Sequence, residues 1–127
     1  MHQDLTDLAN RWILLQHTDR NSLEYDQRFE ASVEIDQLTS KAPALAWEFI
    51  KAVLARSDSE LITFSLAAGP IEDLLMRHPV ETVECIERDI SSSPMLAKAL
   101  HGVWRNDLQA ELWERVVVAR DSHGHVA

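Results

Sequence analysis

The sequence is short of cysteine, glycine and basic side chains, and each shortage narrows the class of protein. The single cysteine, Cys85, excludes an internal disulfide and a thiolate metal cage, and it fits a reducing compartment. Three glycines and four prolines in 127 residues are too few for a disordered or collagen-like chain. The 12 Lys and Arg residues are outnumbered by 21 Asp and Glu residues, which gives a net charge of -9. This charge disfavours nucleic acid and anionic membranes as partners.

Long hydrophobic runs and a visible targeting segment are also lacking. The longest apolar runs, such as 12–15 and 116–119, are far shorter than the roughly 20 residues that cross a bilayer. Met1 to Asp4 show no basic stretch followed by an apolar segment. We therefore expect a cytoplasmic protein with no membrane contact. With 127 residues, 46% of them hydrophobic, the chain is long enough to bury one core.

Apolar residues recur at helical spacing through most of the chain, which predicts an all-α protein. Prolines at 43, 70, 79 and 94 suit the first turns of helices, and their unequal spacing argues against a strict solenoid. We expect one compact domain over residues 1–120, followed by a flexible tail over 121–127. The domain should hold about seven or eight short helices in irregular, α-solenoid-like antiparallel pairs. The expected helices cover about 4–17, 21–40, 43–56, 58–69, 70–77, 79–90, 94–102 and 108–119.

Several short patterns predict where these helices begin, end or pair. The dipeptide Gly69-Pro70 predicts a sharp corner, because glycine adopts the left-handed conformation that ends a helix and proline begins the next one. Asn21 is the expected N-cap of the second helix. In the last helix, Glu111 and Arg115 are spaced to form an ion pair four residues apart.

The four tryptophans are many for this length, and large aromatic side chains serve either a core or an interface. Trp12 and Trp47 lie on apolar helical stripes and are expected in the core. Trp104 is followed by three polar residues and is expected to be partly exposed, whereas Trp113 fits either place.

A block in the second half of the chain resembles a known family. Residues 68–75 read Ala-Gly-Pro-Ile-Glu-Asp-Leu-Leu, and the block is completed by Trp47, Ile86-Glu87, Pro94, Leu100 and Gly102-Val103-Trp104. Over about residues 47–113 this is similar to the signature of a bacterial family of small proteins known only as a domain of unknown function. Its Gly-Pro-apolar-Glu-Asp-Leu-Leu run contains Gly69, Pro70, Glu72 and Asp73. The resemblance implies an α-helical domain and brings no reaction, cofactor or catalytic residue with it.

Acidic residues provide two candidate sites. Glu72 and Asp73 are adjacent on a helix and project about 100° apart, so we expect them to complement the helix dipole and not to converge on one ligand. Glu81, Glu84 and Glu87 recur every third residue and predict a negative stripe. Such a stripe is either a solvated face or a docking surface for a basic partner.

The histidines and the cysteine give weaker signals. His78 and His101 fall near helix ends and lack the i+4 partner of a helical metal pair, so neither indicates a metal site. The segment 123–125, His-Gly-His, could bind a metal only adventitiously. Cys85 follows a glutamate on an acidic helix, which disfavours its thiolate.

Two hypotheses of function follow, and neither needs a cofactor. The leading one is a non-catalytic, acidic, helical protein-interaction module, with a narrower version in which it is an immunity-type protein that occludes the basic surface of a bacterial toxin. Its predicted partner-binding residues are Glu81, Glu84, Glu87, Arg88 and Trp104. The alternative is a small enzyme whose site combines Glu72 or Glu87 with His78 or His101 across helices. A homodimer formed through Trp104 is a third arrangement.

Overall fold

The computed structural model describes residues 5–123, and within this range it contains helices and loops but no strand. The elements are α1 (Leu5–Gln16), α2 (Leu23–Arg28), α3 (Glu30–Lys41), α4 (Pro43–Arg56), α5 (Glu60–Leu66), the π-helical η1 (Ala67–Ile71), α6 (Glu72–Arg77), α7 (Pro79–Asp89), the 3₁₀ helix η2 (Ile90–Ser92), α8 (Pro94–Leu100) and α9 (Ala110–His123). The predicted all-α class and the single compact domain are confirmed.

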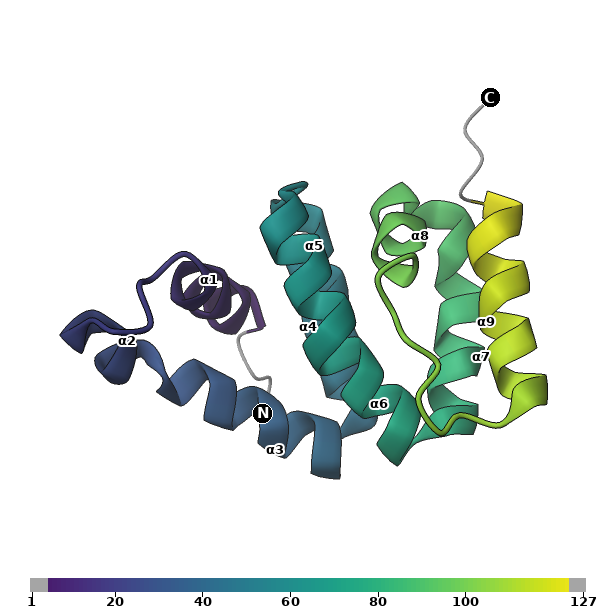
Figure 1. Ribbon diagram of the computed structural model, residues 1–127, viewed down its shortest axis with the longest axis horizontal. Helices are drawn as coiled ribbons and strands as arrows, with labels where there is room; N and C mark the ends of the chain where they lie inside the picture. Colours follow the sequence, from purple (N-terminus) through teal and green to yellow (C-terminus); the bar gives the residue numbers. More distant parts are fainter. Residues whose placement is uncertain (1–4, 124–127) are drawn as a thin grey trace.

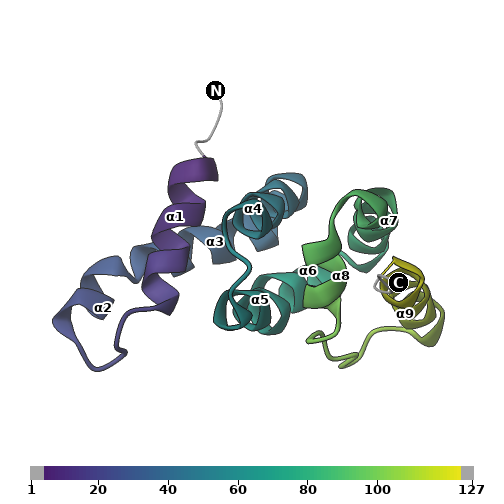
Figure 2. The same cartoon turned by 90° about the horizontal axis from the view of Figure 1, so that it is seen from above.

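The helices are arranged roughly in the order of the sequence. In Figure 1, α1, α2 and α3 lie at one end, α4 and α5 in the middle, and α7, α8 and α9 at the other end. α4 packs against α1 and α3 on one side and against α7 and α8 on the other. Figure 2 shows the same succession from above. One continuous hydrophobic core therefore runs from α1 to α9.

α4 lies at the centre of this core and buries six side chains, Ala46, Trp47, Phe49, Ile50, Val53 and Leu54. Trp47, Phe49 and Ile50 are almost completely buried, and Trp12 of α1 meets the ring of Phe49 edge-on with centroids 5.8 Å apart. Trp12 and Trp47 are thus core residues, as expected, and Trp113 of α9 is partly buried against the core.

Short polar side chains and prolines define most helix starts. Pro43, Pro79 and Pro94 occupy the first turn of α4, α7 and α8, as predicted, where a missing N–H breaks no hydrogen bond. Ser59 and Ser93 cap α5 and α8 by accepting backbone N–H groups of the first turn.

The single helix predicted over 21–40 is wrong, because the chain forms α2 and α3 with a break at Phe29. The N-cap of α2 is Ser22 and not Asn21. α2 buries no side chain, whereas α3 buries Ala31, Ile35 and Leu38. Only the second half of the segment, α3, has an apolar stripe that faces the core.

The sharp corner predicted at Gly69-Pro70 is also wrong. Helical backbone continues from Glu60 to Arg77 through η1, and no glycine in the described part of the chain has a positive φ. A π turn hydrogen-bonds to a carbonyl one residue further back than an α turn, and Pro70 has no N–H to donate to this ladder. The proline is therefore accommodated inside the helix.

The C-terminal helix differs from the prediction in its length and in its ion pair. α9 reaches His123, three residues into the segment expected to be a tail, and residues 124–127 lie outside the described chain. Arg115 binds Glu87 of α7 and not Glu111, because α7 packs against α9 and brings the two groups within 2.5 Å. Among residues 5–123, every helix is too short or too polar to cross a membrane.

Candidate functional site

The continuous helix of α5, η1 and α6 presents Glu72 and Asp73 to two different surfaces. Glu72 hydrogen-bonds to the loop between α8 and α9, residues 101–109, which we call the Trp104 loop. Asp73 lines a cavity that also includes residues of α1, α2 and α3, which we call the Asp73 cleft. The two carboxylates do not converge on one ligand, as their adjacency predicts.

Glu72 fixes the backbone of the Trp104 loop. Its Oε2 atom accepts the backbone N–H of Trp104 at 3.0 Å, and its Oε1 atom accepts the side-chain amide of Asn106 at 2.9 Å. Asn106 adopts a left-handed φ of 52°, a conformation that asparagine tolerates better than most residues. Val103 and Leu108 anchor the loop in the core on either side of this turn.

The loop displays a large aromatic side chain to solvent. Trp104 is 76% exposed, the highest value among the large hydrophobic residues of the described chain. Phe64 of α5, 58% exposed, lies against the start of the same loop, since a Cβ atom at Gly102 would be 3.0 Å from its ring. Leu61, one turn before Phe64, is also exposed. α5 and the Trp104 loop thus form an apolar surface on a fixed backbone, the usual form of an interface anchor.

The Asp73 cleft has a volume of about 250 Å³ and a largely polar lining. Its charged lining groups are Arg20 from the α1–α2 connection, Asp36 of α3 and Asp73 of α6. Asp36 is paired with Arg77 at 3.1 Å, while Arg20 and Asp73 have no hydrogen-bond or ion-pair partner in the described chain. Desolvation raises the pKa of Asp73, although the nearby Arg77 opposes this shift.

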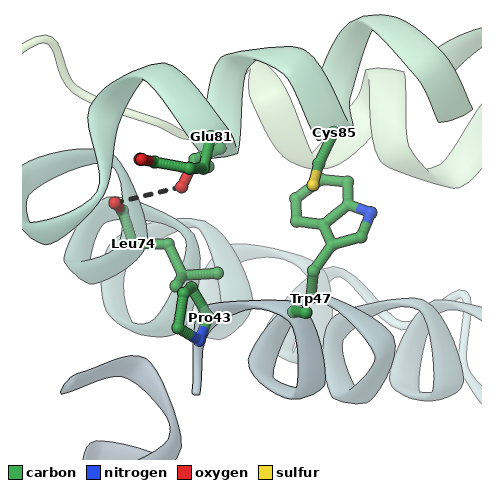
Figure 3. A pocket seen from close by; sticks show the side chains of 7 residues that line it. Pro43, Trp47, Leu74, Glu81 and Cys85 are labelled. Carbon is green, nitrogen blue, oxygen red and sulfur yellow. Dashed lines mark hydrogen bonds between the residues drawn. The ribbon is translucent and has the colours of Figure 1, made fainter. Parts of the chain in front are cut away.

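A smaller, apolar pocket lies between α4 and α7 (Figure 3). Its volume is about 140 Å³, and Figure 3 shows the sulfur of Cys85 beside the ring of Trp47. Thr82 at its edge donates a hydrogen bond to the Leu74 carbonyl at 3.1 Å. Burial raises the pKa of the Cys85 thiol, which disfavours its thiolate form.

The residues predicted to bind a partner fall on two separate surfaces. Glu81 and Glu84 are exposed on α7 and make no hydrogen bond or ion pair in the described structure, although Glu84 lies near enough to Arg115 to contribute to its raised pKa. Glu87 pairs with Arg115, and Arg88 pairs with Asp89. Figure 2 shows α7 along one edge of the molecule and the Trp104 loop along the opposite edge. The acidic stripe and Trp104 do not form one continuous site.

Three of the four residues of the enzyme hypothesis are engaged elsewhere. Glu72 binds the Trp104 loop, Glu87 binds Arg115, and the Nε2 atom of His78 lies 3.0 Å from the Thr39 carbonyl. His101 is exposed at the end of α8. In the described residues no three His, Cys, Asp or Glu side chains gather as metal ligands. Gly124 and His125 of the 123–125 segment lie outside those residues.

Sequence reasoning missed the bond between Glu72 and the Trp104 loop and the whole Asp73 cleft. Both depend on groups that are far apart in the chain, and Arg20 and Tyr25 carry no pattern that marks them as lining residues. The one local signal is Gly69, a glycine within a helical pattern.

The fold and these sites define an all-α domain that carries an ordered loop with a tryptophan and a polar cleft. The chain belongs to DUF6869, a family of unknown function, whose model matches residues 18–124. Comparison with curated proteins and with solved structures gave no match.

Proposed function

We propose that this chain is a non-catalytic protein-interaction module and that Trp104 is the anchor of its binding surface. The observation that supports this most strongly is the pair of hydrogen bonds that Glu72 accepts, one from the backbone N–H of Trp104 and one from the side-chain amide of Asn106. A tryptophan on an ordered loop loses little further backbone entropy on binding, and its indole buries a large apolar area. Phe64, which lies beside Gly102 at the start of the loop, offers a further exposed apolar side chain on α5.

The partner that we propose is a protein with a basic surface around an apolar pocket. A net charge of -9 attracts such a partner and repels a second copy of this chain, so it favours a heterologous complex over a homodimer. Glu81 and Glu84 on the opposite edge are free to add long-range attraction. In its narrower form the proposal is a bacterial, cytoplasmic, immunity-type protein that neutralises a toxin, with the 69–75 run as the family signature.

Affinity purification of matched variants tests the role of Trp104. Tagged wild type, Trp104→Ala and Val118→Ala are compared by quantitative mass spectrometry of co-purified proteins. Val118 is the control because it is also a large exposed hydrophobic residue, at 57%, but lies on α9. A basic protein that is retained by wild type and Val118→Ala and lost with Trp104→Ala is expected, whereas equal recovery on all three would contradict the proposal.

The charge contribution is tested on the same complex. Charge reversal by Glu81→Lys with Glu84→Lys should slow association, with an effect that fades as salt is raised. An unchanged association rate at low salt would remove these two residues from the account and leave Trp104 as the site.

A further inference from the structure

Gly69 occupies a position where the fold itself does not need glycine. Its φ is not positive, and a Cβ atom added there would meet nothing within 4 Å. A glycine inside a helix costs about 0.5–1 kcal/mol relative to alanine. Gly69 lines the Asp73 cleft, so the absence of a side chain leaves room in its wall. The backbone is open to close approach by a ligand at this point.

The lining of the cleft offers a carboxylate to a cation. It contains two carboxylates, Asp36 and Asp73, against one guanidinium, Arg20. Asp36 is paired with Arg77, whereas Asp73 has no hydrogen bond or ion pair in the described chain and is attracted by Arg77 only from a distance. The hydroxyls of Tyr25 and Ser65 add acceptors for N–H donors.

The remaining wall suits an alkyl stem. Trp12, Leu15 and Ile35 contribute buried apolar side chains to the cleft, and Pro70 completes this wall beside Gly69. The volume of about 250 Å³ is below the usual range for drug-sized ligands, about 300–1,000 Å³, and fits a short chain with one charged head.

We propose that the Asp73 cleft is a binding site for a primary ammonium group carried on an alkyl stem, with Asp73 as its counter-ion. This chemistry is shared by a free alkylamine and by the lysine side chain of a protein, and the site does not depend on the role of Trp104.

Titration of the full chain, labelled with ¹⁵N and followed by NMR, tests this site. The probes are 1,5-diaminopentane as a free amine, Nα-acetyl-lysine N-methylamide as a protein-like lysine, and the Nε-acetylated form of the latter as a neutral control. We expect saturable shifts of the amides of residues 65–69 and 71–73 with one or both amines, and none with the neutral control. Tighter binding of the lysine amide identifies a protein lysine as the source, and tighter binding of the diamine identifies a free amine.

Two variants and one control locate the binding. Asp73→Asn should weaken binding of the amine by about tenfold, the size expected when a hydrogen bond to a charged group is lost. Gly69→Ala should weaken it several-fold while the protein stays folded. Glu114→Gln removes an equally negative, exposed and unpartnered side chain on α9 and should leave the affinity unchanged. Absence of saturable shifts, equal binding of the neutral control, or unchanged affinity in Asp73→Asn would each overturn the proposal.

Discussion

Glu72 and Trp104 are 32 residues apart in the sequence and are joined by a 3.0 Å hydrogen bond from the backbone N–H of Trp104 to the carboxylate. The bond couples α6 to the loop between α8 and α9, so the position of the most exposed tryptophan depends on a helix remote in the chain. The loop should therefore be less mobile than its exposure suggests.

Glu72→Ala should release the Trp104 loop without unfolding the protein. Both hydrogen bonds are solvent-accessible, so a loss of about 1 kcal/mol in the free energy of unfolding is expected. Hydrogen exchange of the Trp104 amide should become faster, while Glu114→Ala should leave it unchanged. Equal protection of this amide in wild type and Glu72→Ala would show that Glu72 does not order the loop.

Truncation of two tryptophans should affect stability to very different extents. Trp47 is 1% exposed, and Trp47→Ala should cost about 3–5 kcal/mol of stability. Trp104 is 76% exposed, and Trp104→Ala should change stability by no more than about 0.5 kcal/mol. Denaturant unfolding measures both values, and a large loss of stability in Trp104→Ala would mean that this side chain serves the fold.

Alanine substitutions at two glycines should change the stability of the fold in opposite directions. Gly69→Ala should stabilise the fold by up to about 1 kcal/mol, because alanine favours the helix and the new methyl group meets no neighbour within 4 Å. Gly102→Ala should destabilise it by about 1–3 kcal/mol, because its Cβ would lie 3.0 Å from the Phe64 ring and 3.1 Å from Ala67 Cβ. Thermal unfolding of the two variants side by side checks the order, and a destabilised Gly69→Ala would contradict the open wall of the cleft.

Asp89 should make part of the stability dependent on pH. Hydrogen bonds from Arg88 and from the Trp47 indole, together with Lys51, hold the pKa of Asp89 well below its usual value of 3.8. The stabilisation is complete above the pKa of the unfolded chain and is lost as pH falls below about 4 toward the lower folded-state pKa.

Asp89→Asn should therefore lower stability at pH 7, by about 1–3 kcal/mol, and flatten its decline in acid. Chemical unfolding between pH 2 and 7 measures this, with Asp107→Asn, an exposed and unpaired carboxylate, as the control. Identical acid dependence in wild type and Asp89→Asn would exclude this role.

The sequence predicted those features of the fold that depend on local patterns. The structure confirms the helix starts predicted at proline 43, 79 and 94. It also confirms that Trp47 of α4 lies in the core. The break at Phe29 and the π turn at Pro70 were missed, because both depend on how tertiary packing distributes a long helical segment. The Gly-Pro dipeptide by itself does not distinguish a corner between two helices from a π turn within one helix.

The candidate sites were less predictable than the fold. Exposure of Trp104 followed from its polar neighbours, but the hydrogen bond that orders its loop requires α6 to lie beside the loop that connects α8 and α9. The residues that line the Asp73 cleft come from several separate segments between Trp12 and Asp73, and they follow no common spacing. Only the three-dimensional fold brings such groups into one cavity.

Site-specific photo-crosslinking tests the central claim that the Trp104 loop contacts a protein partner. The photoreactive residue p-benzoylphenylalanine is placed at position 105, exposed beside the retained Trp104, and, as a control, at position 118, and both proteins are irradiated in the cells that encode the chain. We predict a discrete adduct with a basic protein from position 105 only, reduced when Glu72→Ala is added. The same adducts from both positions, no adduct from position 105, or an adduct of two copies of this chain would contradict the account.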